Sequence, residues 1–438
     1  MLQIVEVKLQ SAQHLLLSNL LPFQRLSFTV VKKLCNRQIS PLNICGYGIK
    51  FVILQEKGEN MKSKFPLGIQ TFSEIISGNY LYVDKTAWVY ELAHYAKYQF
   101  LSRPRRFGKS LLVSTMQAYF EGRKELFKGL DIDGLEKEWI SYPVIHIDFS
   151  DSKHDSLDSL KATLDYLLST YEKVYHIDVS PIHKETYNIR LINIIKEAYR
   201  QTGQKVVVLI DEYDAPVRDM IHDSDLQKEK CEILRNFFCP LKPLDAYLRF
   251  VFITGVSKFC QQSICSEFNN LKILTLKDEC AMVCGFTENE LERYFKGSVE
   301  NLAQAHHMTY EQVLAKLQTQ YGGYHFSANS LAIYNPYSII NAFASEGFNN
   351  DWFSSITSTF LMELLRKKGV NMLQLDGLWA SPNRFDVPTD RISDPIPVLY
   401  QSGYLTIKEY NSDIRQYRLD FPNEEVRQGI SEIINHQE

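Results

Sequence analysis

Residues 103–110 bring together a glycine, a lysine and a serine in an order that could hold the phosphates of a nucleotide. The segment is Arg-Pro-Arg-Arg-Phe-Gly-Lys-Ser, between a short apolar run and an apolar helical run. In a strand–loop–helix context, loop amides and the helix N-terminus direct partial positive charge at phosphate oxygens. Gly108 would allow close backbone approach, Lys109 would reach the β- and γ-phosphates, and Ser110 would offer its hydroxyl to Mg²⁺. Alone, Gly-Lys-Ser is a common tripeptide that also fits a surface loop.

Two carboxylates follow the apolar run at 206–210, about 100 residues after this loop. If the run is a buried strand, Asp211 emerges beside the phosphate loop, where it could hold Mg²⁺ directly or through water. Glu212 would polarise the attacking water as a general base. Acidic residues also end strands and cap helices, and Asp214, which precedes Ala-Pro, is expected to be a helix cap. The loop and the acidic strand end together predict a nucleotide site.

A polar residue also ends the next expected strand, at 250–254. In ATPases whose glutamate follows the Mg²⁺-binding strand, a polar side chain at the neighbouring strand end senses the γ-phosphate. Thr254 and Ser257 are the candidates for this role. Turn chemistry around Gly255 is the alternative explanation for both residues.

The expected site therefore draws on three separate segments of the chain. Catalysis is assigned to Lys109 and Glu212. Mg²⁺ is expected to be held by Ser110 and Asp211. The residues expected to contact the nucleotide are Arg103, Pro104, Arg105, Arg106, Phe107, Gly108, Lys109, Ser110, Leu111 and Thr254.

The elements that must position these residues alternate between β-like and helical runs. Strands are expected at 99–102, 144–149, 206–210, 250–254 and, more weakly, 271–276. Helices are expected between them at 110–120, 157–171, 191–200 and 229–238. Continuous apolar strands separated by helices indicate a parallel sheet covered on both faces. Ligands of such sheets bind at the carboxyl ends of the strands, where the candidate residues lie.

Helix signals replace this alternation after residue 284. They are the capping-box pairs Thr287 with Glu290 and Thr309 with Gln312, the cap Asn335 before Pro336 with a helix end at Gly347, and an amphipathic run at 354–369. Two β-like runs flank residues 411–413, which predicts a hairpin, and Asn423 is expected to cap a last helix. We therefore expect an α/β P-loop NTPase domain at 61–285, with a parallel sheet and flanking helices. A helical and winged-helix-like region is expected at 286–438.

The bulk composition is that of an ordinary globular chain. The 438 residues are 45% hydrophobic and 23% charged, with a formal net charge of −4. This near balance gives no global attraction to nucleic acid or to an anionic membrane, although a local patch is not excluded. Eight cysteines without a regular pairing pattern indicate free thiols in a reducing cytoplasm. No uninterrupted apolar span reaches the ~20 residues that a bilayer crossing needs.

Residues 1–60 differ in character from the rest, because organised patterning starts near Met61. Two interpretations stay open. The segment is either an upstream-translated or poorly ordered extension before a working start at Met61, or a peripheral segment packed on the domain.

An ordered set of motifs resembles one protein family. The matching segments are 82–86 (Tyr-Val-Asp-Lys-Thr), 103–110, 210–214, 254–258, 285–288, 321–324, 334–336 and 421–426. In these segments, which span about residues 61–430, the chain resembles the bacterial AAA-ATPase-like proteins. These often carry a C-terminal nuclease-like domain of the PD-(D/E)xK superfamily. Their phosphate loop typically has Arg-Pro-Arg-Arg before Gly-Lys-Ser, so Arg103 at the position of the usual first glycine is a family trait.

The resemblance implies a protein that binds ATP with Mg²⁺ and starts near Met61. The nuclease-like domain normally follows the 421–426 segment. Because the chain stops at Glu438, that domain is expected to be missing, and DNA cleavage is not inferred. The expected partner is the nucleotide, without a membrane, while homo-oligomers and nucleic acid stay open.

Three functions are carried forward from the sequence. The leading hypothesis is ATP hydrolysis that drives a conformational change in the C-terminal region. The second is a nucleotide-gated regulatory switch that binds ATP with little turnover. The third is a DNA-associated module of a defence or mobile-element system, as the family's nuclease-like companion suggests.

Two smaller questions also stay open. Arg103, Arg105 and Arg106 could bind phosphate or pair with Asp84. A zinc site is the less favoured alternative to free or buried thiols for the four cysteines Cys260, Cys265, Cys280 and Cys284.

Overall fold

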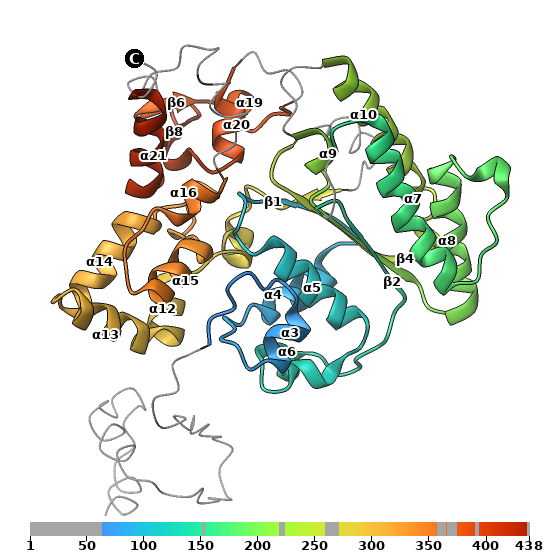
Figure 1. Ribbon diagram of the computed structural model, residues 1–438, viewed down its shortest axis with the longest axis horizontal. Coiled ribbons are helices and arrows are strands. Elements are labelled where there is room, and N and C mark those ends of the chain that lie inside the picture. The colour runs from blue at the N-terminus through green and yellow to red at the C-terminus, as the bar shows by residue number, and fades with distance from the viewer. Residues whose placement is uncertain are drawn as a thin grey trace, which may run out of the picture. The chain divides into compact units, whose positions relative to one another are not determined.

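In the computed structural model, a five-stranded parallel sheet forms the centre of the described chain (Figure 1). The strands are β1 (Tyr98–Ser102), β2 (Val144–Asp148), β3 (Val206–Asp211), β4 (Leu248–Gly255) and β5 (Lys272–Ile273). Their order is β2-β3-β4-β1-β5, and every neighbouring pair is parallel. The five expected strands are confirmed, with β4 longer and β5 shorter than the apolar runs indicated. The fold is mixed α/β with a parallel sheet, as expected.

The structure describes residues 64–150, 154–218, 224–258, 271–356, 365, 375–389 and 394–435. Residues 1–60, for which two interpretations stay open, therefore lie outside the described residues. Cys260, Cys265 and most of the helix expected at 354–369 also lie outside it. Within the described ranges, every helix is too short or too polar to cross a bilayer.

Helices cover both faces of the sheet (Figure 1). One face packs against α7 (Leu157–Val174), α8 (Tyr187–Thr202) and α10 (Ser224–Phe238), and the other against α3 (Phe72–Ser77), α4 (Thr86–Tyr95) and α5 (Lys109–Phe120). In β3, Val206, Val208 and Ile210 pack in the first cluster, whereas Val207 and Leu209 pack in the second. Successive side chains of a strand point to opposite faces, so a strand covered on both sides is continuously apolar.

Short elements connect these strands and helices. They are η1 (Lys124–Phe127), α6 (Asp131–Leu135), η2 (Pro181–His183), α9 (Ala215–Arg218), η3 (Cys239–Leu241) and η4 (Asp245–Tyr247). The four long helices expected around the sheet are confirmed, and α8 and α10 begin four and five residues earlier than the apolar runs indicated.

The strand order brings the predicted site residues to one edge of the sheet. Strand β4 lies between β1 and β3, so Leu101 pairs with Thr254 and Ile210 with Ile253. The phosphate loop after β1, the end of β4 and the end of β3 are therefore neighbours. Ligands of parallel sheets bind at this carboxyl edge.

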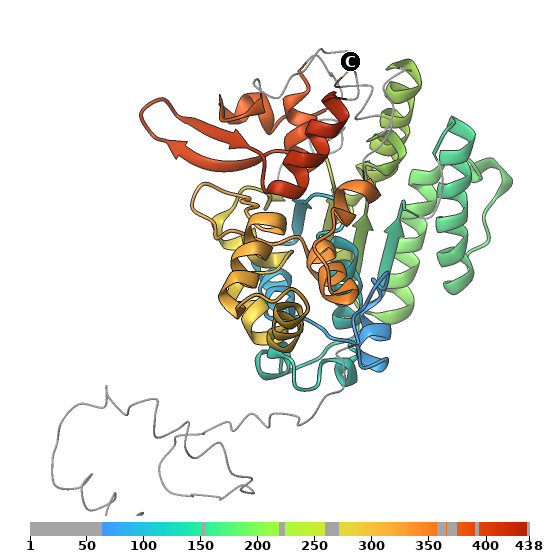
Figure 2. The same ribbon diagram turned by 60° about the vertical axis from the view of Figure 1, so that its left-hand side comes forward.

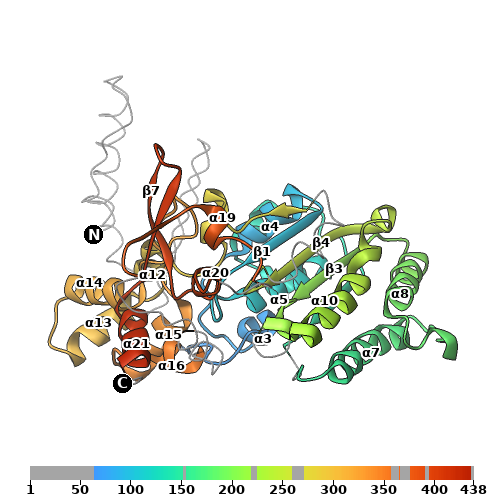
Figure 3. The same ribbon diagram turned by 90° about the horizontal axis from the view of Figure 1, so that it is seen from above.

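A helical region follows the sheet and lies beside it (Figure 3). Its elements are η5 (Asp278–Val283), α12 (Glu288–Tyr294), α13 (Lys296–Ala305), α14 (Tyr310–Tyr321) and α15 (Pro336–Ser345). Both capping boxes and the Asn335 cap are confirmed. The expected end of α15 is wrong by one residue, because Glu346 rather than Gly347 adopts the left-handed conformation, with φ of 51°.

The remaining elements form a small module with its own apolar core. They are α16 (Asp351–Ile356), β6 (Leu378–Ala380), α19 (Pro382–Phe385), α20 (Ile396–Gln401), β7 (Thr406–Asn411), β8 (Gln416–Asp420) and α21 (Glu424–Asn435). The strands form an antiparallel sheet in the order β6-β8-β7. Figure 2 shows the β7–β8 hairpin projecting from this module. The hairpin and the Asn423 cap, which accepts a hydrogen bond from Val426 N, are confirmed.

The division at residue 285 stays a prediction. Some apolar contacts cross it, since Tyr324, Phe326 and Ile333 pack in the same cluster as α5. Among the described cysteines, Cys239, Cys280 and Cys284 are not part of a disulfide. Cys231 is disulfide-bonded, which departs from the expectation of free thiols throughout.

Candidate functional site

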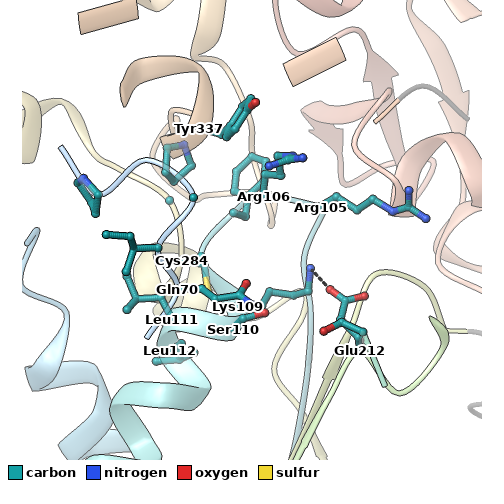
Figure 4. Close-up of a pocket in the computed structure, with 18 of the residues that line it drawn as sticks. Gln70, Arg105, Arg106, Lys109, Ser110, Leu111, Leu112, Glu212, Cys284 and Tyr337 are labelled. Atoms are coloured by element: carbon teal, nitrogen blue, oxygen red, sulfur yellow. Dashed lines mark ion pairs between the residues drawn. The ribbon is translucent and has the colours of Figure 1, made fainter. Parts of the chain in front are cut away.

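The phosphate loop opens onto a cavity of about 880 Å³. The cavity is lined by every residue from Arg105 to Leu112, and by Glu212 and Arg218 from the segment after β3. Its volume is within the ~300–1,000 Å³ that is typical of small-molecule sites. Figure 4 shows residues of this lining, with Arg105 and Arg106 on the same loop as Lys109.

Gly108 and Lys109 shape the part of the loop that faces the cavity. Gly108 has φ of 90°, and a Cβ there would meet nothing within 4 Å. The glycine is needed because L-residues with side chains rarely adopt this backbone conformation. Lys109 begins α5, so free amides at the N-terminus of that helix face the same space. This is the local geometry that phosphate binding requires.

Arg103 does not line the cavity, which corrects the expectation that it binds phosphate. Its side chain is 1% exposed, and it donates to the carbonyls of Ser102 and Thr275 at 2.9 and 3.0 Å and of Cys280 at 2.9 Å. The guanidinium also lies 4.1 Å from the ring centroid of Phe326. Burial lowers the pKa of this guanidinium. Arg103 therefore fixes the start of the loop to β5 and η5.

The alternative pairing of these arginines with Asp84 is also wrong for the contacts described. Asp84 accepts hydrogen bonds from the backbone and hydroxyl of Thr86 and from the amide of Asp131. Its carboxylate thus holds the starts of α4 and α6. The arginines of the loop take other roles, since Arg106 places its guanidinium 4.3 Å from the ring centroid of Tyr337 at the cavity.

Contacts of Pro104 and Phe107 stabilise the conformation of the loop. Pro104 lies outside the cavity lining, and its carbonyl accepts a hydrogen bond of 3.2 Å from Lys109 Nζ. Phe107 is buried, edge-on to the rings of Tyr324 and Phe326. Leu111 follows in α5 and lines the cavity. Tyr324, which follows α14, packs against Phe107 of the phosphate loop.

Lys109 and Glu212 meet across the cavity. Lys109 Nζ lies 3.0 Å from Glu212 Oε1, as the dashed line in Figure 4 marks. Arg218 holds the other carboxylate oxygen, with NH1 2.6 Å from Oε2. Burial alone would raise the pKa of Glu212, but the charges of Lys109 and Arg218 outweigh it and hold that pKa well below its usual range. Glu212 has φ of 48°, a conformation that costs an L-residue about 1–2 kcal/mol.

Asp211 and Ser110 form the candidate Mg²⁺ position. Asp211 is 1% exposed, and the hydroxyl of Ser110 acts on its carboxylate to lower its pKa. Burial, followed by the charge of Glu212, raises the pKa of Asp211 to about 7. A buried carboxylate beside a hydroxyl fits a hard cation, which would relieve that cost. Within the described ranges no group of three or more His, Cys, Asp or Glu side chains could hold a metal, so phosphate and water oxygens would supply the remaining ligands.

The end of β4 carries a buried hydroxyl. Thr254 Oγ1 is buried without a hydrogen-bond partner, and Thr254 lies outside the cavity lining. Asp214 does not cap its own helix with its side chain, which corrects that expectation. Its carboxylate accepts from Val256 N at 3.2 Å and from Ser257 N and Oγ at 2.8 and 2.7 Å. Asp214 therefore ties the segment after β3 to the segment after β4, and Ser257 is engaged there.

The cavity lining also includes apolar side chains from segments outside the phosphate loop and the strand ends. They are Ile69, Val83, Phe286, Tyr337 and Ile340. Sequence reasoning also missed Arg218, which follows Glu212 by six residues and belongs to no recognisable motif. Its role could not be recognised from the sequence, because α9 brings its side chain to the cavity only in the folded chain.

Three comparisons relate this chain to known proteins. A family model described as "Predicted AAA-ATPase" matches residues 66–265. A protein of Azotobacter chroococcum mcd 1, named "Uncharacterized protein in vnfD 5'region", is 31% identical over 382 residues, which are 85% of this chain and 70% of that protein. Among solved structures, "Structure of Drosophila ORC bound to AT-rich DNA and Cdc6" matches 84% of this chain and 92% of that chain, at 11% identity and a TM-score of 0.23.

The solved structure is too distant to contribute to the fold assignment, which rests on the sheet and the phosphate loop. The family model covers the segment that contains β1, the loop and the end of β3. The relative extends the match over most of the chain. The chain therefore belongs to the predicted AAA-ATPase family.

Proposed function

We propose that this protein binds Mg²⁺-ATP in the cavity at the phosphate loop and hydrolyses it. The observation that carries the proposal is the meeting of Lys109 and Glu212, 3.0 Å apart, from two segments about 100 residues apart in sequence. Opposite charges from a phosphate loop and from the end of another strand of the same sheet are what phosphoryl transfer needs on the two sides of a γ-phosphate. The apolar part of the cavity lining, with Ile69, Val83 and Ile340, suits a purine base.

Each residue has a distinct task in this proposal. The amides after Gly108 and the ammonium of Lys109 bind and orient the β- and γ-phosphates. Ser110 and Asp211 hold Mg²⁺, which would neutralise charge that develops on the phosphate oxygens. Glu212 orients the attacking water and accepts its proton. Thr254, whose hydroxyl is buried and unpaired, is proposed as the residue that senses the γ-phosphate.

We further propose that hydrolysis is coupled to the C-terminal module, residues 351–435. Three contacts support the coupling. Trp352 Nε1 donates a hydrogen bond of 3.0 Å to the carbonyl of Arg105 in the phosphate loop. A Cβ at Gly403 would lie 2.7 Å from Pro104 Cβ, so the module packs closely on the loop. The amide of Lys258, after β4, donates to Gln401 Oε1 at 2.7 Å.

Titration with a fluorescent ATP analogue tests the binding site. Lys109→Ala is expected to weaken binding by about 100-fold, because a buried charge–phosphate contact is lost. The matched control is Lys228→Ala, whose exposed side chain pairs with Asp225 outside the cavity. Equal binding by Lys109→Ala and the wild type would overturn the site assignment.

Steady-state turnover separates hydrolysis from the second candidate, a nucleotide-gated switch. The switch is favoured by one observation, the double ion pair that occupies Glu212 with Lys109 and Arg218. Glu212→Gln is expected to bind ATP and to lower kcat by about 100-fold or more. If the wild type turns ATP over no faster than this variant, the protein is a switch.

Three expectations remain proposals beyond the site. A cytoplasmic location is proposed from the composition, and homo-oligomers and nucleic-acid binding stay open as partners. DNA association would require retention at physiological salt with a steep salt dependence of affinity.

A further inference from the structure

Arg218 lines the cavity, and neither the motifs nor the proposed tasks explain its role. It lies at the end of the four-residue helix α9 and lines the cavity beside Glu212. Its NH1 contacts Glu212 Oε2 at 2.6 Å and, more loosely, Asp214 Oδ1 at 3.4 Å. The side chain is 16% exposed, which leaves it partly shielded from solvent.

The two cations that hold Glu212 are not equivalent. Lys109 belongs to the phosphate loop and takes Oε1, whereas Arg218 belongs to the same segment as Glu212 and takes Oε2. A γ-phosphate carries more charge than a carboxylate, so it would draw the Lys109 ammonium away from Oε1. Arg218 would keep its contact with Oε2, and Oε1 would be released toward the cavity.

Contacts of the surrounding segment hold the backbone of Arg218 in place. The amide of Arg218 donates to the carbonyl of Asp214, and the carboxylate of Asp214 is anchored on Val256 and Ser257. Asp214 is fully buried. The guanidinium is therefore carried on a short helix that is attached to the end of β4.

We propose that Arg218 is a positioning residue that holds Glu212 by Oε2 so that Oε1 accepts the proton of the attacking water. The inference rests on the proposed hydrolysis. In the step it serves, the water oxygen bonds to the γ-phosphorus and the bond from that phosphorus to the β–γ bridging oxygen breaks. ADP leaves, and the water proton passes to Glu212 Oε1. Arg218 acts through Glu212 and does not touch the phosphate.

A double-mutant cycle on the full chain with Mg²⁺-ATP tests this role. Arg218→Ala is expected to lower kcat by about 10- to 100-fold, because misplacing a reacting group by about 1 Å costs that much. KM and the affinity for the fluorescent ATP analogue are expected to change by less than about threefold. In a Glu212→Gln background, Arg218→Ala is expected to lower kcat no further, because the group it positions is already lost.

Two further variants separate positioning from folding. Arg218→Lys keeps the charge and is expected to recover part of the lost kcat, although a single ammonium lacks the planar fork. Arg200→Ala removes an exposed arginine that pairs with Glu197 outside the cavity, and is expected to leave kcat unchanged. Melting temperatures of all variants show whether a loss of kcat reflects unfolding.

The outcomes distinguish this inference from the proposed function. Equal kcat for the wild type and Arg218→Ala, or an undiminished loss in the Glu212→Gln background, overturns the positioning role and leaves hydrolysis intact. A loss of nucleotide affinity as large as the loss of kcat also overturns it, because Arg218 would then contact the phosphate. Absence of turnover in the wild type overturns the proposed hydrolysis and this inference with it.

Discussion

The two halves of the phosphate loop are held in opposite ways. In the first half, residues 103–107, Arg103 and Phe107 point into the protein and are at most 1% exposed. In the second half, residues 108–110, the backbone of Gly108 and the side chain of Lys109 face the cavity. In this phosphate loop, which lacks the usual first glycine, buried side chains therefore fix the conformation of the first half. Substitutions of the buried Arg103 and Phe107 should change stability, and those in the second half should change nucleotide binding.

The largest effect is expected for Arg103→Ala. The substitution leaves the buried carbonyls of Ser102, Thr275 and Cys280 without their donor, so the free energy of unfolding should fall by about 2–4 kcal/mol. Urea unfolding followed by circular dichroism measures this loss. Arg384→Ala, which removes a partly exposed pair with Asp394, is the control and should cost less than about 1 kcal/mol. Weaker nucleotide binding at unchanged stability would contradict the comparison.

A pH-dependent effect on stability is expected where the C-terminal module contacts the first half of the phosphate loop. Glu425 is buried and accepts hydrogen bonds from Ser338 Oγ and Trp352 N, and burial raises its pKa to about 7. The folded state therefore binds more protons than the unfolded state between pH 4.5 and about 7. The contribution of Glu425 to stability is present below that window and is lost as pH rises through it.

Glu425→Gln should remove this dependence. Between pH 5 and 8, the unfolding free energy of the wild type should fall relative to the variant by about 1–3 kcal/mol. Urea unfolding at several pH values measures the difference. Parallel pH profiles for the two proteins would show that Glu425 does not titrate in this window.

A smaller effect is expected for Gly108→Ala in the second half. An alanine at φ of 90° costs about 1–2 kcal/mol, although nothing lies within 4 Å of the added Cβ. The loop should relax, and affinity for the fluorescent ATP analogue should fall by about tenfold. Gly134→Ala is the matched control, because that glycine also has open space but lacks a positive φ. Full affinity in Gly108→Ala would show that the second half tolerates a changed backbone.

The smallest effect is expected for Trp352→Phe, which removes the hydrogen bond to the Arg105 carbonyl and keeps an aromatic ring. The unfolding free energy should fall by about 1 kcal/mol. If the module is coupled to the loop, the difference in melting temperature with and without Mg²⁺-ATP should also shrink. Trp379→Phe, in β6, is the control. If Mg²⁺-ATP shifts the melting temperature of Trp352→Phe as much as that of the wild type, this hydrogen bond does not couple the module to the loop.

Local patterns predicted the elements of the fold but not their order. The apolar run that became β3 and the capping box at Thr287 depend only on neighbouring residues, so both were accurate. The sheet order depends on contacts between segments 42 to 173 residues apart, which a single sequence does not encode in any short motif. The placement of Thr254 beside the loop after β1 became visible only through the pairing of β4 with β1.

The same distinction applies to the candidate site. Lys109 and Glu212 belong to motifs and do meet in the cavity, whereas Arg103 shares the loop motif but is turned inward. Its partners, Thr275 and Cys280, lie more than 170 residues away, and no spacing rule links them to the loop. Asp214 was expected to cap a helix. Its actual partners lie on the segment after β4, and no local sequence pattern links them to Asp214.

Trp352 also gives the protein a built-in optical reporter. It is one of four tryptophans in the chain, and its indole is fully buried against the phosphate loop. Indole emission responds to hydrogen bonding and to the polarity of its surroundings. Any movement of the Arg105 carbonyl would therefore change the emission spectrum of the unlabelled protein, and with it the kinetics of loop rearrangement could be followed by stopped flow.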